Sequence, residues 1–82
     1  MEITMKRKHI LVEKYEVDLK IGVRFLDWQR TAPSMAHALR IAKLPASTKL
    51  VFNEHGWAKR ETPGKDVFGN PVVMQTVFTI RD

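Results

Sequence analysis

The chain has 82 residues, of which 44% are hydrophobic and 28% charged, a composition typical of one small globular domain rather than of a disordered segment. It contains no cysteine, which excludes disulfides, zinc–thiolate sites, iron–sulfur clusters and thiol nucleophiles. Fourteen Lys and Arg against nine Asp and Glu give a net charge of +5, which favours polyanions or acidic protein surfaces as partners.

The amino-terminal segment MEITMKRKH is basic and lacks the apolar block of a signal peptide. No apolar run in the chain approaches the roughly 18 residues that a membrane span needs. We therefore expect a protein of the reducing cytoplasm without a membrane partner. Residues 1–8 are expected to form a loose basic tail, in which Lys6, Arg7 and Lys8 provide a cationic arm.

Apolar and polar residues alternate strictly from Tyr15 to Phe25, which predicts one long strand with one apolar face. A sheet covered on one side only favours antiparallel pairing. No Asn-Gly or Asp-Gly pair interrupts the alternation, so a single bent strand is favoured over a tight hairpin, with Gly22 marking a kink. The preceding HILVE, residues 9–13, either extends this strand or pairs with it.

The phase of the alternation changes after Phe25, because Leu26 and Trp28 both fall on even positions. A bulge between Phe25 and Asp27 would rotate Trp28 back toward the core.

The segment TAPSMAHALRIAKLP, residues 31–45, predicts a helix. Pro33 and Ser34 form a plausible entry, because the Ser34 hydroxyl can accept a hydrogen bond from a free amide of the first turn. Apolar residues recur at helical spacing at Met35, Ala38, Leu39 and Ala42, and Pro45 is expected to stop the helix.

The remainder predicts strands joined by turns. TKLVFNE, residues 48–54, reads as a strand, and WAKRE, residues 57–61, as a short return strand after a turn at Gly56. TPGKDVFGNP, residues 62–71, is predicted as a second, longer connection. The closing VVMQTVFTI, residues 72–80, carries apolar residues on both faces, which indicates a central or helix-covered strand.

The order is therefore a long strand, a helix and two or three further strands, that is β-α-β-β-β. This predicts the α+β class, with one domain over residues 1–82 and one helix on one face of an antiparallel sheet of three to five strands.

The sequence offers little chemistry for catalysis or metal binding. His9, His37 and His55 are the histidines, and no pair has a spacing that converges on a metal, so neither a metal site nor another cofactor is predicted. Glu54 and His55 are adjacent in a turn and should point apart. We predict a non-enzymatic protein without catalytic residues. A small metal-dependent nuclease using Glu54, His55 and Asp66 is the less favoured alternative.

The interleaving of aromatic and basic residues is the stronger signal. In a strand, Trp57 and Lys59 would lie on the same face, where they could stack on a base or hold a phosphate. The candidate binding residues are Trp57, Lys59, Arg60, Lys65, Phe68, His55, Lys6, Arg7 and Lys8. Alternatively, Trp57 packs over the sheet edge, Phe68 packs onto its own loop, and the lysines protect an edge strand. A self-associating accessory domain, including a homodimer, also stays open.

The layout of the chain resembles that of small phage-encoded inhibitors of bacterial defence, the anti-CRISPR proteins in particular. The similarity rests on the alternating YEVDLKIGVRF, the capped helix PSMAHALRIAKL and the strands KLVFNEHGWAKRE and VVMQTVFTI. It implies an inhibitor that acts in a bacterial host by occupying a nucleic-acid-handling complex. The predicted function is thus a small basic binding protein whose partner is nucleic acid or a ribonucleoprotein or protein complex.

Overall fold

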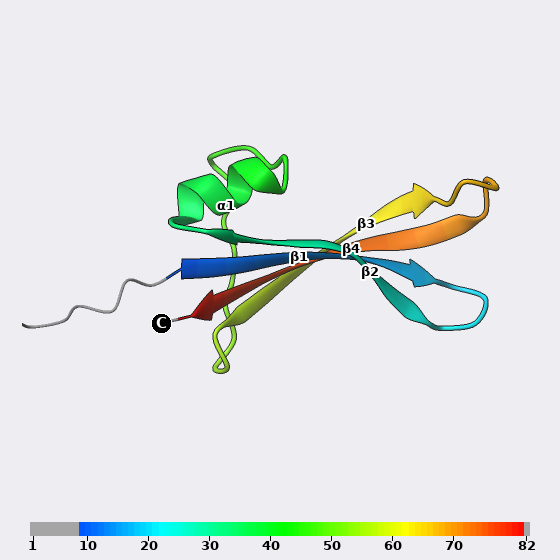
Figure 1. The fold of residues 1–82 in the computed structure, drawn as a ribbon, viewed down its shortest axis with the longest axis horizontal. Coiled ribbons are helices and arrows are strands. Elements are labelled where there is room, and N and C mark those ends of the chain that lie inside the picture. The colour runs from blue at the N-terminus through cyan, green and yellow to red at the C-terminus, as the bar shows by residue number, and fades with distance from the viewer. Residues whose placement is uncertain (1–8, 82) are drawn as a thin grey trace, which may run out of the picture.

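Four antiparallel strands form one sheet in the order β2-β1-β4-β3 (Figure 1). The computed structural model describes residues 9–81. Its strands are β1 (His9–Asp18), β2 (Arg24–Ala32), β3 (Trp57–Lys65) and β4 (Pro71–Arg81), and its helix is α1 (Met35–Ile41). The predicted α+β class, with one helix on one face of an antiparallel sheet, is confirmed.

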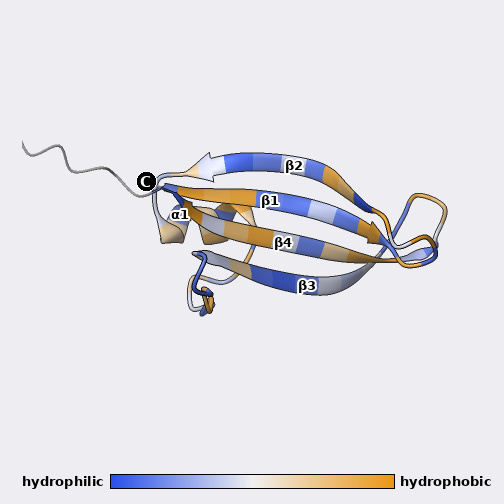
Figure 2. Cartoon of the chain, turned by 90° about the horizontal axis from the view of Figure 1, so that it is seen from below, coloured by the Kyte–Doolittle hydropathy of each residue, from blue (hydrophilic) through white to orange (hydrophobic). Residues whose placement is uncertain are grey.

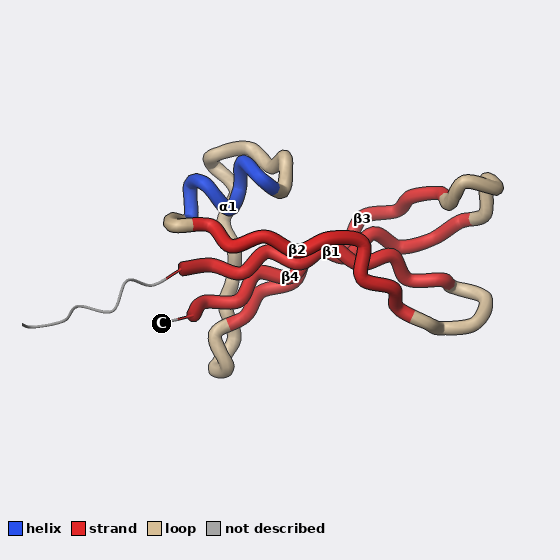
Figure 3. Tube along the Cα trace, viewed as in Figure 1, coloured by secondary structure: helices blue, strands red, loops and turns tan. Residues whose placement is uncertain are grey.

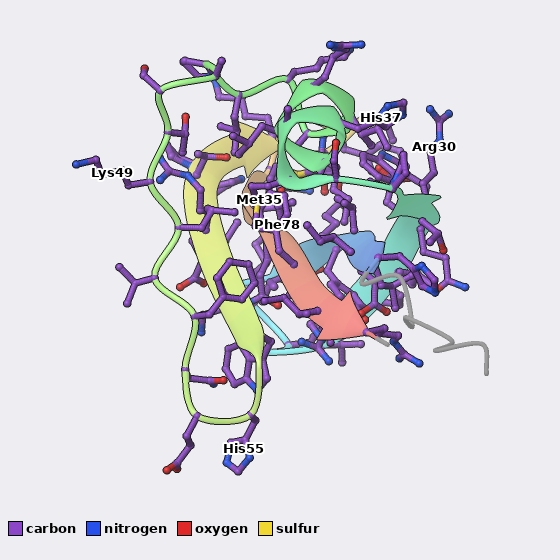
Figure 4. The ribbon with its side chains drawn as sticks, turned by 90° about the vertical axis from the view of Figure 1, so that its left-hand side faces the viewer. Arg30, Met35, His37, Lys49, His55 and Phe78 are labelled. Atoms are coloured by element: carbon purple, nitrogen blue, oxygen red, sulfur yellow. The ribbon has the colours of Figure 1, made fainter. Side chains whose placement is uncertain are left out.

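The core lies between α1 and one face of the sheet, which we call the covered face; the opposite face is the open face. The buried residues of this core are Ile10, Val12, Ala32, Ala38 and Phe78. Figure 4 shows Phe78 rising from β4 toward Met35 on α1. The closing strand is central, between β1 and β3, as its apolar residues on both faces predicted.

Helix α1 begins as predicted but ends earlier. The Ser34 hydroxyl accepts a hydrogen bond from the His37 backbone amide, at 3.2 Å. The helix ends at Ile41 rather than at Pro45, because Lys43 adopts a left-handed conformation (φ 59°). The Leu44 amide then donates to the Leu39 carbonyl, at 2.9 Å, which closes the last turn before the proline is reached.

The alternating segment after residue 15 is two strands, so the prediction of one long strand is wrong. β1 ends at Asp18, β2 begins at Arg24, and Gly22 lies in the turn between them at φ 68°. The Asp18 amide donates to the Val23 carbonyl at 2.9 Å, which closes the hairpin. The apolar–polar alternation continues through this turn because Leu19, Ile21 and Val23 are apolar, although all three are exposed. The segment 9–13, left open above, is the first half of β1.

The predicted bulge is confirmed. The register between β1 and β2 shifts between Lys14 and Tyr15, which lie opposite Trp28 and Leu26, so that Asp27 is the extra residue. The shift places Trp28 on the covered face, where it packs against the core.

The segment 48–54 is irregular, so the strand predicted there is wrong. Leu50 and Phe52 nevertheless pack against the core, which explains their apolar spacing. In Figure 4 this connection runs beside the edge of β3. β3 itself continues to Lys65 and pairs with β4, so the predicted long connection over residues 62–71 shrinks to a turn at residues 66–70.

The sheet extends beyond the part that α1 covers. At one end, which we call the hairpin end, it terminates in the turns 19–23 and 66–70, with no helix beside them (Figure 3). Figure 2 looks onto the open face with α1 behind the strands, and hydrophobic segments are visible in the hairpin-end loops. Within residues 9–81 no helix has the length and apolar character to cross a membrane.

Candidate functional site

Trp57 and Lys59 lie on the open face of the sheet. Trp57 is opposite Thr79 of β4 and Lys59 is opposite Val77, two positions further along the same strand. Because successive side chains in a strand alternate between faces, both project to the same side, as predicted. Trp57 is 38% exposed, so part of its surface is accessible to a partner while the larger part is covered.

Arg24 of β2 joins this face from the other side of the sheet. Its guanidinium carbon lies 4.1 Å from the centre of the Tyr15 ring, a cation–π contact. Its Nη1 also donates to the Gln75 side-chain oxygen, at 3.0 Å. Gln75 is buried although it belongs to the open face. The arginine is therefore held flat across the sheet by two contacts.

Tyr15 is held in a fixed orientation. Its hydroxyl donates to a Glu13 carboxylate oxygen at 2.7 Å. This hydrogen bond, with desolvation and the Glu13 charge, raises the pKa of Tyr15 above its ordinary value of 10.0, while Arg24 acts in the opposite direction. The ring is thus neutral at physiological pH, with one end hydrogen-bonded and one face covered by the guanidinium.

These side chains surround a hollow of about 310 Å³ on the open face. Its lining comes from all four strands and consists of Glu13, Tyr15, Arg24, Trp57, Lys59, Gln75, Val77 and Thr79. Trp57 supplies an aromatic surface, and Arg24 and Lys59 supply cations. Lys59 lies 3.8 Å from Glu61, but both side chains are exposed, so this pair holds the lysine weakly. The hollow suits a planar group attached to an anionic one.

The structure separates the other predicted binding residues. Arg60 lies opposite Thr76 and projects to the covered face, away from Lys59. His55 is close in sequence to Trp57 but sits in an exposed turn. Its Nε2 lies 3.6 Å from Glu54 Oε1, so these two side chains approach each other instead of pointing apart as predicted. Lys6, Arg7 and Lys8 lie outside the described residues.

Lys65 and Phe68 lie at the hairpin end. Eight residue steps along β3 separate Lys65 from Trp57, which is about 26 Å. Phe68 is 85% exposed and does not pack onto its own loop. These two residues cannot contribute to the hollow around Trp57.

The residues of the nuclease alternative do not meet. Glu54 and His55 precede β3, whereas Asp66 follows it, so a strand of nine residues lies between them. Across residues 9–81 no group of three or more His, Cys, Asp or Glu side chains could hold a metal ion. A divalent ion could not be shared by this trio within one molecule.

Sequence reasoning missed Arg24, Tyr15 and Gln75 as members of the site. The available signal was the position of Arg24 shortly after Gly22: a hairpin there places it opposite Val17 on β1, beside Tyr15. The strand pairing between β1 and β4, which puts Gln75 opposite Tyr15, left no such signal.

Comparisons with protein-family models, with curated proteins and with solved structures yield no match for this chain. The functional assignment therefore depends on the geometry of the open face.

Proposed function

We propose that this protein binds single-stranded nucleic acid on the open face of its sheet, without catalysing a reaction. The observation that carries the proposal is the placement of Trp57 and the Arg24–Tyr15 stack around one hollow, with Lys59 at its rim. Aromatic side chains stack on unpaired bases, and cations beside them track the phosphates. Bases in a duplex are stacked on each other, so this surface favours a single strand.

The charge of the chain supports this choice of partner. The net charge of +5 attracts a polyanion to the molecule as a whole. On the open face, Arg24 and Lys59 outnumber Glu13 in the lining of the hollow. Glu61 lies 3.8 Å from Lys59 and offsets part of its charge, which leaves Arg24 as the cation of the hollow without a paired carboxylate within residues 9–81.

The layout resemblance to anti-CRISPR proteins extends the proposal to the biological setting. The bound strand would belong to a nucleic-acid-handling complex in the cytoplasm of a bacterial host, and this protein would act by occupying it. Among the residues that line the hollow there is no serine, cysteine or histidine.

The test is fluorescence anisotropy with labelled single-stranded DNA, single-stranded RNA and duplex DNA, each about 16 nucleotides long. Loss of one stacked base costs about 1 to 3 kcal/mol, so Trp57→Ala should weaken binding of a single strand by about 5- to 150-fold. Phe68→Ala removes an equally aromatic but distant side chain and serves as the control. Absence of binding at about 50 mM salt, or equal affinity of Trp57→Ala and wild type, refutes the proposal.

Self-association through a strand edge is the second candidate, favoured by one observation. β2 is at the margin of the sheet, and within residues 9–81 no strand pairs with its outer edge. Two copies could therefore pair along β2. Light scattering over a range of concentrations tests this: a dimer that persists at high salt supports it, and a monomer throughout excludes it.

A further inference from the structure

The hollow on the open face contains a buried amide group with unused donors. Gln75 is 7% exposed, and its Oε1 accepts a hydrogen bond from Arg24 Nη1 at 3.0 Å. Because an N–H donor must face the amide oxygen, this contact fixes the orientation of the amide group and turns Nε2 the other way. Nε2 forms no hydrogen bond within residues 9–81, where no polar side-chain atom is both buried and unpartnered. The N–H donors of Nε2 are therefore open to the hollow that Gln75 lines.

Glu13 supplies acceptors to the same hollow. One carboxylate oxygen, Oε2, accepts from the Tyr15 hydroxyl at 2.7 Å. The other, Oε1, has no hydrogen-bond partner in the part of the chain between residues 9 and 81. Glu13 lies opposite Val77 of β4, and Gln75 lies two positions away on that strand, opposite Tyr15. Glu13 and Gln75 are thus diagonal neighbours on one face, with Cβ atoms about 7 Å apart.

This pair of side chains discriminates between the bases that can stack on Trp57. A carboxylate accepts most strongly from two neighbouring N–H donors, and an amide nitrogen donates to an acceptor beside them. Guanine carries this order on its Watson–Crick edge, because its N2 amino group and N1–H donate and its O6 accepts. Adenine and cytosine each have a single amino group beside an acceptor, and uracil has a single N–H between two carbonyls. Guanine is therefore the base that gives the carboxylate two hydrogen bonds.

We infer that the hollow selects guanine, with Glu13 accepting from N1–H and the N2 amino group and Gln75 donating to O6 while the base stacks on Trp57. The inference rests on the proposed binding of a single strand, since an unpaired base leaves its Watson–Crick edge free. It also explains a carboxylate in a hollow that binds an anionic chain. Tyr15 and Arg24 hold the two recognition groups in place, so little side-chain freedom is lost when the base binds.

The experiment is fluorescence anisotropy with labelled strands of about five nucleotides that are thymidine except at the centre. The central base is guanine, hypoxanthine, adenine or cytosine. Hypoxanthine matches guanine but lacks the N2 amino group, so it isolates one of the two hydrogen bonds to the carboxylate. Wild type should bind the guanine strand about tenfold more tightly than each of the other three, which is the effect of one hydrogen bond to a charged group.

Glu13→Gln is the test variant, because its amide oxygen still accepts from the Tyr15 hydroxyl while the negative charge and the second acceptor are lost. It should bind the guanine and hypoxanthine strands with nearly equal affinity. Glu61→Gln is the matched control, since it removes the same charge from a residue that lies opposite Gln75 but outside the lining of the hollow. It should keep the preference for guanine. Urea denaturation of each variant verifies that the fold is retained.

The preference is a ratio of affinities measured on one protein, so total charge does not affect it. Equal affinity of wild type for the guanine and hypoxanthine strands overturns the inference, and so does a preference that persists in Glu13→Gln. If the strands bind without discrimination and Trp57→Ala weakens them all, the proposed function stands although guanine selection fails. If wild type binds none of the short strands, the inference fails, and the longer strands described above decide separately whether the proposed function stands.

Discussion

Adjacent basic residues on opposite faces of β3 allow the open-face proposal to be tested with a matched pair. Lys59→Ala and Arg60→Ala each remove one positive charge, so both lower the net charge of the whole chain equally. Lys59 belongs to the lining of the hollow, and Arg60 projects to the covered face. Any difference between the two variants must come from position and not from total charge.

The expected size of the difference follows from the phosphate contacts. One contact to a single strand contributes about 0.7 to the slope of log affinity against log salt, so Lys59→Ala should flatten the slope by that amount. Between about 50 and 200 mM salt, wild type should then lose about 2.6-fold more affinity than the Lys59 variant. A charge contact near the surface in high dielectric adds about 1 kcal/mol, so the variant should also bind about fivefold more weakly at low salt. Arg60→Ala should leave the slope close to that of wild type.

The assay is fluorescence anisotropy of a labelled single strand over a salt series, with all three proteins measured side by side. The weak pairing of Lys59 with Glu61 does not complicate the result, because both side chains are exposed and the pair contributes little to folding. Equal slopes for the two variants would show that the attraction is distributed over the molecule. A larger effect of Arg60→Ala would place the strand on the covered face and refute the reasoning.

Two further predictions concern the core and the open face. Phe78 is 0% exposed in the centre of the core, so Phe78→Ala should lower the free energy of unfolding by about 3 to 5 kcal/mol in urea denaturation. The control Phe68→Ala should change this free energy by less than about 0.5 kcal/mol, because Phe68 is exposed. Similar losses in the two variants would contradict the assignment of the core. Tyr15 is the only tyrosine, so absorbance at alkaline pH reports its ionisation directly. Glu13→Ala should lower the pKa of Tyr15, because the hydrogen bond and the carboxylate charge that raise it are lost. Since the folded pKa is raised, the stabilisation from this hydrogen bond is present below pH 10.0 and is lost as pH rises through the folded value. An unchanged titration in the variant would mean that Glu13 does not act on the ring.

Several features were predictable because they depend on residues close together in the chain. Ser34 caps the helix through a contact to His37, three residues away, and the even positions of Leu26 and Trp28 revealed the bulge. Apolar residues on both faces of the last strand indicated its central place. In the same way, the strand period alone put Trp57 and Lys59 on one face, since backbone geometry alternates side chains whatever the strand pairs with.

The turn between β1 and β2 was not predictable, because the residues that form it continue the apolar alternation of the strands. Leu19 and Ile21 would be buried in a continuous strand, but the structure leaves both exposed at the hairpin end. The strand predicted over residues 48–54 was wrong for the opposite reason. The segment has the spacing of a strand, and Leu50 and Phe52 do contact the core, but β4 already pairs with β3 on that side of the sheet.

The amino-acid sequence determined the α+β class, the helix start and the pairing of an aromatic with a basic residue on β3, because local periodicity and capping act within a few residues. Tertiary structure alone decided which face carries the candidate site and which basic residues line the hollow. Arg24, Tyr15 and Gln75 come from three strands and meet only through the register of β2, β1 and β4. The same register sends Arg60 to the covered face and leaves Phe68 at the far end, since strand order and the position of α1 are set by long-range packing.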